Sequence, residues 1–212
     1  MADNYLDKKL EDYKARSASA NVSRKVVSSL NSLLIKNRSC RGYDASFIVR
    51  DDQLRNIIEV NTKVPSARNA QVLRYRPVNS NEAAKVLPHI HLGGALPELS
   101  LPLPGTEPNA FIIICTTVPE SKNVYIDLGI SAQSMLLRAV EMGLAGVCIG
   151  AFDKEHIKRE FSLTHEPLMI LAIGRSCEDI RLVEISEGES QKYYRKDGIH
   201  YVPKLRLDDI II

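Results

Sequence analysis

"AFIIICTTV", residues 110–118, is a continuous apolar run of strand length that is rich in β-branched residues. Such a run predicts a strand that is buried on both faces. Two similar runs, "LAGVCIG" at 144–150 and "LMILAIG" at 168–174, predict two more buried strands. The short charged segment between them, "DKEHIKREF", predicts a helix. The core of the fold is therefore a sheet whose central strands are covered on both sides.

Helical periodicity surrounds these strands. Apolar residues recur at helical spacing from Asp127 to Gly143, which predicts the longest helix of the chain. Another helix begins at Asp51 or Asp52, either of which is a good N-cap, and a third covers residues 21–36 after a further helix nearer the N-terminus. Helices and strands do not follow a strict βαβ repeat, so the pattern predicts the α+β class.

Length, charge and cysteine usage limit the possible functions. The 212 residues suffice for one hydrophobic core, so we expect one domain over residues 1–212, with residues 1–20 as a helical extension. The 28 basic and 26 acidic residues nearly balance, which favours neither a nucleic acid nor a membrane surface as partner. The four cysteines are widely spaced, and neither a signal peptide nor an apolar membrane span is visible. We expect a reduced, cytoplasmic protein.

Side chains for acid–base or nucleophilic catalysis do not form a recognisable set. The glycines at 143, 146 and 150 follow a helix and precede a strand, which is the reverse of a dinucleotide-binding loop. His89 and His91 lie in a Pro-rich stretch, and no further ligand at useful spacing completes a metal set. We therefore predict neither a metal site nor a catalytic side chain, and instead a cofactor that supplies its own reactivity.

Two basic clusters could bind an anion: "KNRSCR" at 36–41 and "PKLR" at 203–206. In an extended strand Lys204 and Arg206 point the same way, so both could reach one ligand. Alternatively, each cluster is a solvated basic patch. A third polar stretch, "VPSARNAQVLRY" at 64–75, is suited to a turn between a helix and a strand, with Tyr75 packing into the core.

Four motifs in this order carry a family resemblance: "NRSCRGY", "VPSARNAQVLRY", "DLGISAQSMLLRAVEMGLAGVCIGAF" and "PKLRLDDII". Together they resemble the nitroreductase family of FMN-dependent oxidoreductases, over residues 33–211. The resemblance implies a nitroreductase-like α+β fold with a central mixed, mainly antiparallel sheet flanked by helices. It also implies a homodimer with FMN in the interface, built from both protomers.

The same resemblance implies the cofactor-binding residues. The FMN phosphate and the polar edge of the flavin would be held by Arg38, Ser39, Arg41, Lys204 and Arg206. The flavin ring and ribityl chain would be touched from the partner subunit by Pro65, Ser66, Ala67 and Asn69. The backbone at Gly150 and Ala151 would face flavin N5. Two departures from the family pattern concern this site: Asn37 stands where many members have Arg, and Val72 and Leu73 replace Pro-Trp.

The implied activity is electron transfer from NADH or NADPH, a transient reductant, through flavin N5 to a nitroaromatic, a quinone or a similar small acceptor by a ping-pong mechanism. One alternative is another flavin reaction of the superfamily, such as reductive dehalogenation or flavin consumption. Another is a non-catalytic flavin-binding dimer. The Pro-rich loop 88–108 covers the region where family members differ in substrate contacts, so the acceptor stays open.

Overall fold

The computed structural model describes residues 28–92 and 101–212, so the predicted extension at 1–20, part of the helix at 21–36 and part of the loop 88–108 lie outside the described residues. The described elements follow one another in this order: α2 (Leu30–Lys36), α3 (Asp51–Glu59), η1 (Val60–Thr62), η2 (Ala67–Asn69), β1 (Leu73–Val78), η3 (Ala83–Lys85), η4 (Leu87–His89), β2 (Ala110–Thr116), α4 (Lys122–Glu141), β3 (Ala145–Ile149), α5 (Lys154–Glu160), β4 (Glu166–Gly174), β5 (Asp179–Ile185), β6 (Tyr194–Lys196), β7 (Ile199–Leu205) and η5 (Leu207–Asp209).

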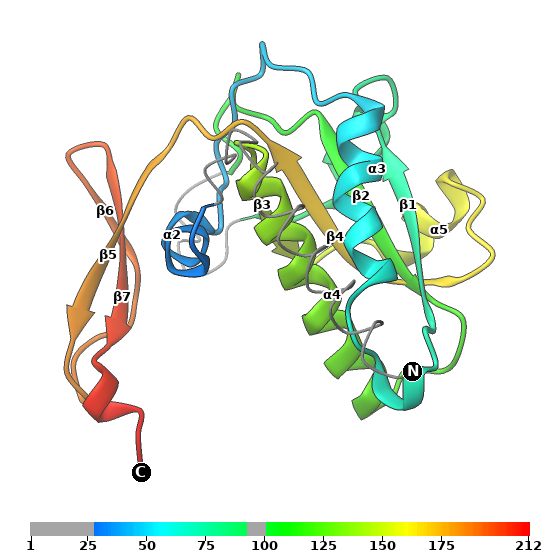
Figure 1. The fold of residues 1–212 in the computed structure, drawn as a ribbon. Coiled ribbons are helices and arrows are strands. Elements are labelled where there is room, and N and C mark those ends of the chain that lie inside the picture. The colour runs from blue at the N-terminus through cyan, green and yellow to red at the C-terminus, as the bar shows by residue number, and fades with distance from the viewer. Residues whose placement is uncertain (1–27, 93–100) are drawn as a thin grey trace, which may run out of the picture.

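The main sheet has the strand order β1-β2-β4-β3, and its neighbours are all antiparallel (Figure 1). The three predicted apolar strands are confirmed as β2, β3 and β4, and every residue of β2 is buried. Pro77 lies in β1, where an edge position tolerates a residue without a backbone N–H. The α+β class and a mainly antiparallel central sheet flanked by helices are confirmed.

Alternation along β2 divides the core into two faces. Ile112 and Ile114 belong to the cluster that α3 and α4 complete, whereas Phe111 and Ile113 belong to the opposite cluster, which includes Ile157 of α5. Side chains of a strand alternate between faces, so an apolar residue at every position requires cover on both sides. Helices and short helical turns provide that cover.

Helix α4 starts earlier than Asp127, and that predicted boundary is wrong. Ser121 is the N-cap, and its hydroxyl accepts a hydrogen bond from the N–H of Val124 at 3.4 Å. Asp127 therefore lies inside the helix and is buried. The helix ends before Gly143, whose φ of +76° gives the left-handed conformation common just after a helix.

Two glycines allow close approaches that position the basic segment at 37–43. A Cβ at Gly174 would lie 2.6 Å from the ring of Tyr43, and a Cβ at Gly146 would lie 2.6 Å from the carbonyl oxygen of Ala172. Ser39 forms an isolated parallel bridge with Gly146. Gly146 thus allows close packing within the sheet. Its place in the glycine pattern at 143, 146 and 150 therefore has a structural reason and not a phosphate-binding one.

The C-terminal part forms a second sheet with the order β5-β7-β6, in which β5 and β7 are parallel. Figure 1 shows this sheet set apart from the main sheet, with α2 on the side that faces it. Strands β5 and β6 were not predicted. Among residues 28–92 and 101–212, every helix is too short or too polar to cross a bilayer.

Candidate functional site

The structure brings the two basic clusters together around one cavity of about 200 Å³, here called the cationic cavity. Its lining residues are Asn37, Arg38, Ser39, Arg41, Tyr193, His200, Val202 and Lys204. Three of these side chains are cations and none is a carboxylate. Such a lining suits an anionic group with several oxygen acceptors, because charge-assisted hydrogen bonds are the strong ones.

Arg38 lines this cavity and carries a buried donor without a partner among the described residues. Its NH2 group donates to the carbonyl oxygen of Leu34 at 2.7 Å, which fixes the side chain against α2. Its Nε is buried and has no hydrogen-bond partner among the described residues. Burial lowers the pKa of Arg38, but an arginine stays charged. The charge of this guanidinium and its unpaired Nε–H beside the cavity favour an anion there.

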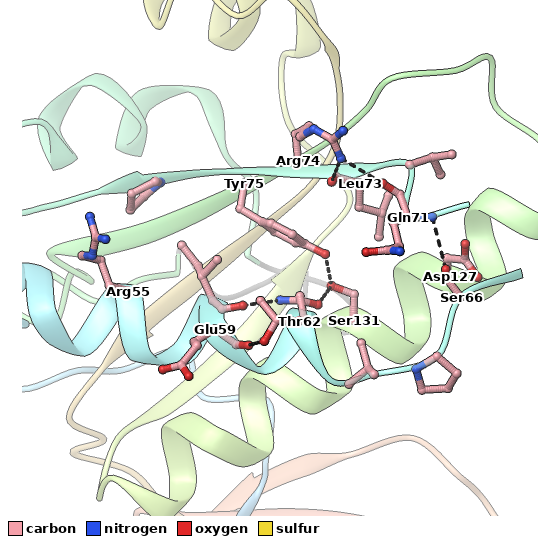
Figure 2. A pocket seen from close by; sticks show the side chains of 16 residues that line it. Arg55, Glu59, Thr62, Ser66, Gln71, Leu73, Arg74, Tyr75, Asp127 and Ser131 are labelled. Carbon is pink, nitrogen blue, oxygen red and sulfur yellow. Dashed lines mark hydrogen bonds between the residues drawn. The ribbon is translucent and has the colours of Figure 1, made fainter. Parts of the chain in front are cut away.

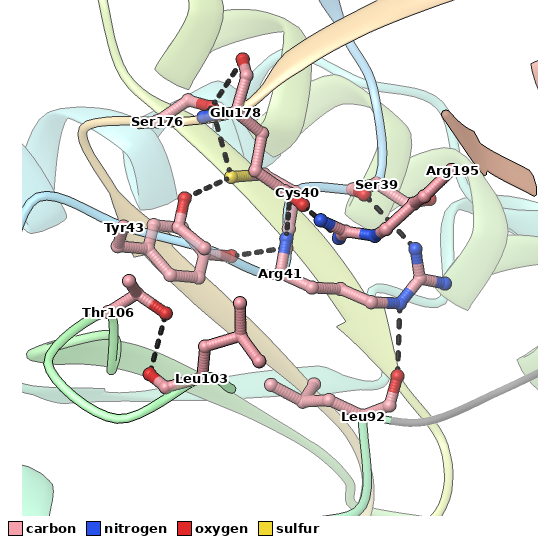
Figure 3. A network of polar contacts seen from close by, with 11 residues as sticks. Ser39, Cys40, Arg41, Tyr43, Leu92, Leu103, Thr106, Ser176, Glu178 and Arg195 are labelled. Carbon is pink, nitrogen blue, oxygen red and sulfur yellow. Dashed lines mark hydrogen bonds and ion pairs between the residues drawn. The ribbon is translucent and has the colours of Figure 1, made fainter. Parts of the chain in front are cut away.

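Arg41 is held in place by a network that the sequence did not reveal (Figure 3). Its Nε donates to the carbonyl oxygen of Leu92 at 3.0 Å, and its NH1 donates to that of Ser39 at 3.2 Å. Its backbone N–H donates to Oε2 of Glu178 at 2.6 Å, and the second oxygen of Glu178 pairs with Arg195. The carboxylate of Glu178 is thus already occupied and does not compete with a ligand for the guanidinium of Arg41.

Cys40 lies next to these arginines but is not a reactive thiol. Its Sγ donates toward the hydroxyl of Ser176 at 3.2 Å, and its carbonyl oxygen accepts from the hydroxyl of Tyr43 at 2.8 Å. Burial raises the pKa of Cys40 to about 12. The thiol therefore stays protonated at neutral pH and supports the loop rather than the chemistry.

Arg206 lies outside the cationic cavity, although it was expected to join Lys204 there. Strand β7 ends at Leu205, and the Nε of Arg206 approaches Oδ2 of Asp209 at 3.3 Å. Of the C-terminal pair, only Lys204 lines the cavity.

A second cavity of about 590 Å³, here called the loop cavity, opens between α3, β1 and α4 (Figure 2). Pro65 and Ser66 line it, together with polar groups from α4 and β1 such as Asp127, Ser131 and Tyr75. The hydroxyl of Tyr75 is 2.9 Å from that of Ser131, which itself donates to Oδ1 of Asn61 at 2.6 Å. Tyr75 also packs against the core, as predicted.

The segment at residues 66–71 has an unusual backbone. Arg68, Asn69 and Gln71 have φ angles of 56°, 53° and 49°, in the left-handed region that few residues other than glycine adopt. Asn tolerates this region well, but Arg and Gln do so at a cost. Such conformations gather at functional sites, where the surrounding structure enforces them.

Hydrogen bonds hold this segment against α4. The N–H of Ala67 donates to Oδ1 of Asp127 at 2.8 Å, and the N–H of Gln71 donates to the hydroxyl of Ser66 at 3.2 Å. The side-chain amide of Gln71 also donates to Oδ1 of Asn69 at 3.1 Å. Asp127 was missed as a site residue because its sequence context indicated only a helix start.

The predicted flavin contacts lie in three separate places in one chain. The cationic cavity and the loop cavity share no lining residue. Gly150 and Ala151 follow β3 and line neither of them. A Cβ at Gly150 would meet no atom within 4 Å, and the carbonyl oxygen of Ala151 accepts from the N–H of His91 at 3.0 Å.

A group of possible metal ligands lies at the start of α5, shortly after Gly150 and Ala151, and at the end of η4. The sequence indicated no partner ligands for His89, but in the structure one ligand atom each from His89, Asp153 and His156 lie within 4.8 Å of one another. The two imidazole rings are stacked, however, at 3.4 Å and 17°. Nitrogen lone pairs lie in the ring planes, so those of two nearly parallel rings do not converge on one ion. The absence of a metal site stays a prediction.

Comparison with known proteins supports one family. Residues 106–175 match the Nitroreductase family. A nitroreductase family protein from Clostridium difficile 630 has 25% identity and a TM-score of 0.57, over 71% of this chain and 86% of that one. A search of curated proteins finds no match.

Two further solved structures share the fold. The nitroreductase family protein from Streptococcus pneumoniae TIGR4 has a TM-score of 0.62 at 15% identity, over 87% of this chain and 99% of that one. A mutant of the FMN and NADPH-dependent nitroreductase NfnB from Sphigopyxis sp. strain HMH has a TM-score of 0.57 at 18% identity, over 71% of this chain and 89% of that one.

Proposed function

We propose that this chain, whose resemblance to the nitroreductase family is confirmed by the match over residues 106–175 and by its fold, is an FMN-dependent oxidoreductase. The observation that carries the proposal is the cationic cavity. It joins Arg38, Arg41 and Lys204 from opposite ends of the chain, has no carboxylate among its described lining residues, and borders a buried donor on Arg38 that has no described partner. These features fit a phosphate group.

In this proposal the protein supplies binding and electrostatics. Bound FMN would provide the redox chemistry, accepting a hydride from NADH or NADPH and returning electrons to a nitroaromatic, a quinone or a similar small acceptor in ping-pong order. Arg38, Ser39, Arg41 and Lys204 would hold the phosphate and the polar edge of the flavin, and Arg206, which pairs with Asp209, would contribute less. Arg41, fixed by Leu92 and Ser39, would face negative charge without having to reorganise.

The remaining residues would act across a homodimer. Pro65, Ser66, Ala67 and Asn69 would touch the flavin bound by the partner protomer, while the backbone at Gly150 and Ala151 would face N5. Two observations support an assembly of this kind: the two cavities are separate in one chain, and large apolar side chains are exposed on α2 and at the C-terminus. The exposed set includes Leu30, Ile35, Leu207, Ile210 and Ile211.

The proposal is tested by the absorbance spectrum of the purified protein, with FMN added, before and after NADH or NADPH under anaerobic conditions. We expect a bound flavin spectrum that bleaches. A bound flavin that neither reductant bleaches would favour the non-catalytic alternative. A protein that takes up no FMN would overturn the proposal.

Dimerisation is tested separately by sedimentation of the full chain and of a chain that lacks residues 209–212. We expect the full chain to sediment as a dimer and the shortened chain to dissociate more readily, because the deletion removes three exposed isoleucines. A monomer at the concentration used for flavin binding would contradict the shared site.

A further inference from the structure

His200, in β7, is a buried polar residue whose environment is not explained by the protein alone. Its side chain is only 3% exposed, and neither ring nitrogen has a hydrogen-bond partner among the described residues. Buried polar groups are nearly always hydrogen-bonded, and an unpaired one is unfavourable. Such a ring requires a partner outside the described protein atoms, such as a water, an ion or a ligand.

The position of His200 shows where that ligand would lie. The residue lines the cationic cavity and also a third cavity, of about 130 Å³, whose lining includes Arg41, Glu178 and Arg195. It lies on the same strand as Lys204, four positions away, and alternate residues of a strand share a face. His200 and Lys204 therefore reach the cationic cavity from one side of β7.

Several charged groups lie around His200. Arg195 is its register partner on β6, Arg41 belongs to the segment before α3, and Glu178 belongs to the turn before β5. Glu178 already pairs with Arg195 and accepts from the N–H of Arg41. The ring of Tyr193 lies 5.3 Å away at 58°. Arg38, Lys204 and Asp179 also line the cavities that His200 lines, and Asp179 pairs with Arg181. Cations therefore outnumber anions around His200, and both carboxylates are already engaged.

We propose that His200 donates a hydrogen bond to the phosphate group of the bound flavin cofactor, and that it takes up a proton as this group binds. The inference rests on the proposed function, since it concerns the same cavity. It adds a titratable ring to the fixed positive charges of Arg38, Arg41 and Lys204, and it makes affinity for the phosphorylated flavin depend on pH.

The direction of the pH effect follows from the charges. In the free protein, burial and then the nearby Arg195 lower the pKa of His200, so the ring is neutral at pH 7. A phosphate in contact with the ring favours its charged form and raises the pKa again. A group that gains a proton on binding makes binding tighter as the pH falls. Affinity should therefore increase from alkaline to mildly acid pH.

The experiment measures FMN and riboflavin binding by flavin fluorescence at about pH 5.5 to 8.5, which spans the ordinary histidine range. The proteins are the wild-type chain stripped of flavin, His200→Gln, and His91→Gln as a control at an exposed histidine. Free FMN itself titrates at about pH 6, but this affects all three proteins equally. The difference between wild type and His200→Gln thus isolates His200.

We expect His200→Gln to bind FMN about tenfold more weakly than wild type at the acid end, with a smaller difference at the alkaline end. Riboflavin, which lacks the phosphate, should bind both proteins equally, and His91→Gln should behave as wild type. Identical FMN pH profiles for wild type and His200→Gln would overturn the inference while leaving flavin binding intact.

A second measurement does not depend on flavin or on the stability of a variant. The chain has five histidines, so selective histidine labelling gives an NMR spectrum in which His200 can be followed as inorganic phosphate is added. We expect its resonance to move and its pKa to rise. An unmoved resonance would overturn the inference. A moving resonance in a protein that binds no flavin would overturn the proposed function and leave His200 as an anion contact.

Discussion

The backbone N–H of Ala67 donates a hydrogen bond of 2.8 Å to Oδ1 of Asp127, which lies 60 positions later in the chain. Asp127 is 5% exposed and belongs to α4, the longest described helix. The bond fixes the start of a segment in which Arg68, Asn69 and Gln71 are all left-handed. A rigid helix thus holds the loop that we propose as the partner's contribution to the flavin site.

Replacing Asp127 should loosen that segment. Asp127→Ala leaves the N–H of Ala67 without its partner, so we expect the free energy of unfolding to fall by about 1–3 kcal/mol, measured by urea denaturation. Asp127→Asn keeps a carbonyl oxygen in place and should cost less. The matched control is Lys122→Ala, an exposed change on the same helix. Equal stability of all three variants would show that the bond does not hold the segment.

The contact between Gly174 and Tyr43 gives a second prediction about stability. In Gly174→Ala the new methyl group would meet the buried ring of Tyr43 at 2.6 Å, so we expect a loss of about 1–3 kcal/mol. Gly129→Ala, inside α4 with no atom near the new methyl, should instead stabilise by about 0.5–1 kcal/mol. Thermal unfolding of the two variants checks the opposite signs. A stabilised Gly174→Ala would refute the packing argument.

The strands that the sequence predicted are those whose signal is local. Strands β2, β3 and β4 carry continuous apolar runs because both faces of the sheet are covered. Strand β5 is largely exposed and does not contain such a run, so it was missed. The start of α4 was misplaced because Asp127 has the residue type of an N-cap, whereas its real partner is Ala67. A contact between residues 60 positions apart does not change the periodicity of apolar residues from which the helix was predicted.

In the candidate site, too, features with a local sequence signal were predicted and features that depend on long-range contacts were not. The motifs at both ends of the chain predicted the cations of the cationic cavity, since basic residues in short clusters are visible in the sequence. The groups that position or complement them were not visible. Glu178 and Arg195 meet Arg41 only through the turn before β5 and the pairing of β6 with β7. His200 acquires its environment from the same pairing.

Thiol reactivity should follow burial. Burial raises the pKa of Cys40 to about 12 and that of Cys115 to about 11. It also raises the pKa of Cys148 and of Cys177, but these two residues are exposed and therefore accessible to a reagent. At about pH 8 the buried pair stays protonated, so a disulfide reagent should modify Cys148 and Cys177 in the native protein and all four after denaturation. Mass spectrometry of the labelled peptides assigns the sites. Rapid native labelling of Cys40 would contradict its buried environment.

The raised pKa values of Cys40 and Cys115 should also make the folded protein less stable at alkaline pH. A thiol whose pKa is higher in the folded protein than in the unfolded chain contributes stability below the unfolded value, and this is lost as the pH rises toward the folded value. For Cys115 and Cys40 the loss should begin near the ordinary thiol pKa of 9.0 and grow up to the folded values of about 11 and about 12. Urea denaturation of Cys40→Ala and wild type from about pH 8 to 10.5 should show the steeper decline in wild type. Parallel declines would show that the Cys40 thiol does not cause this loss of stability.

Lys204 and Arg206 should contribute unequally to FMN binding. Lys204 lines the cationic cavity, whereas the Nε of Arg206 is engaged by Asp209. Lys204→Ala removes a charge-assisted bond worth about 1.5–3 kcal/mol, so we expect FMN affinity to fall by roughly tenfold to a hundredfold, while Arg206→Ala should cost less. Lys196→Ala, an exposed change on β6, is the control. Equilibrium dialysis against FMN gives the affinities, and a larger loss in Arg206→Ala would mean that Arg206 leaves Asp209 for the cofactor.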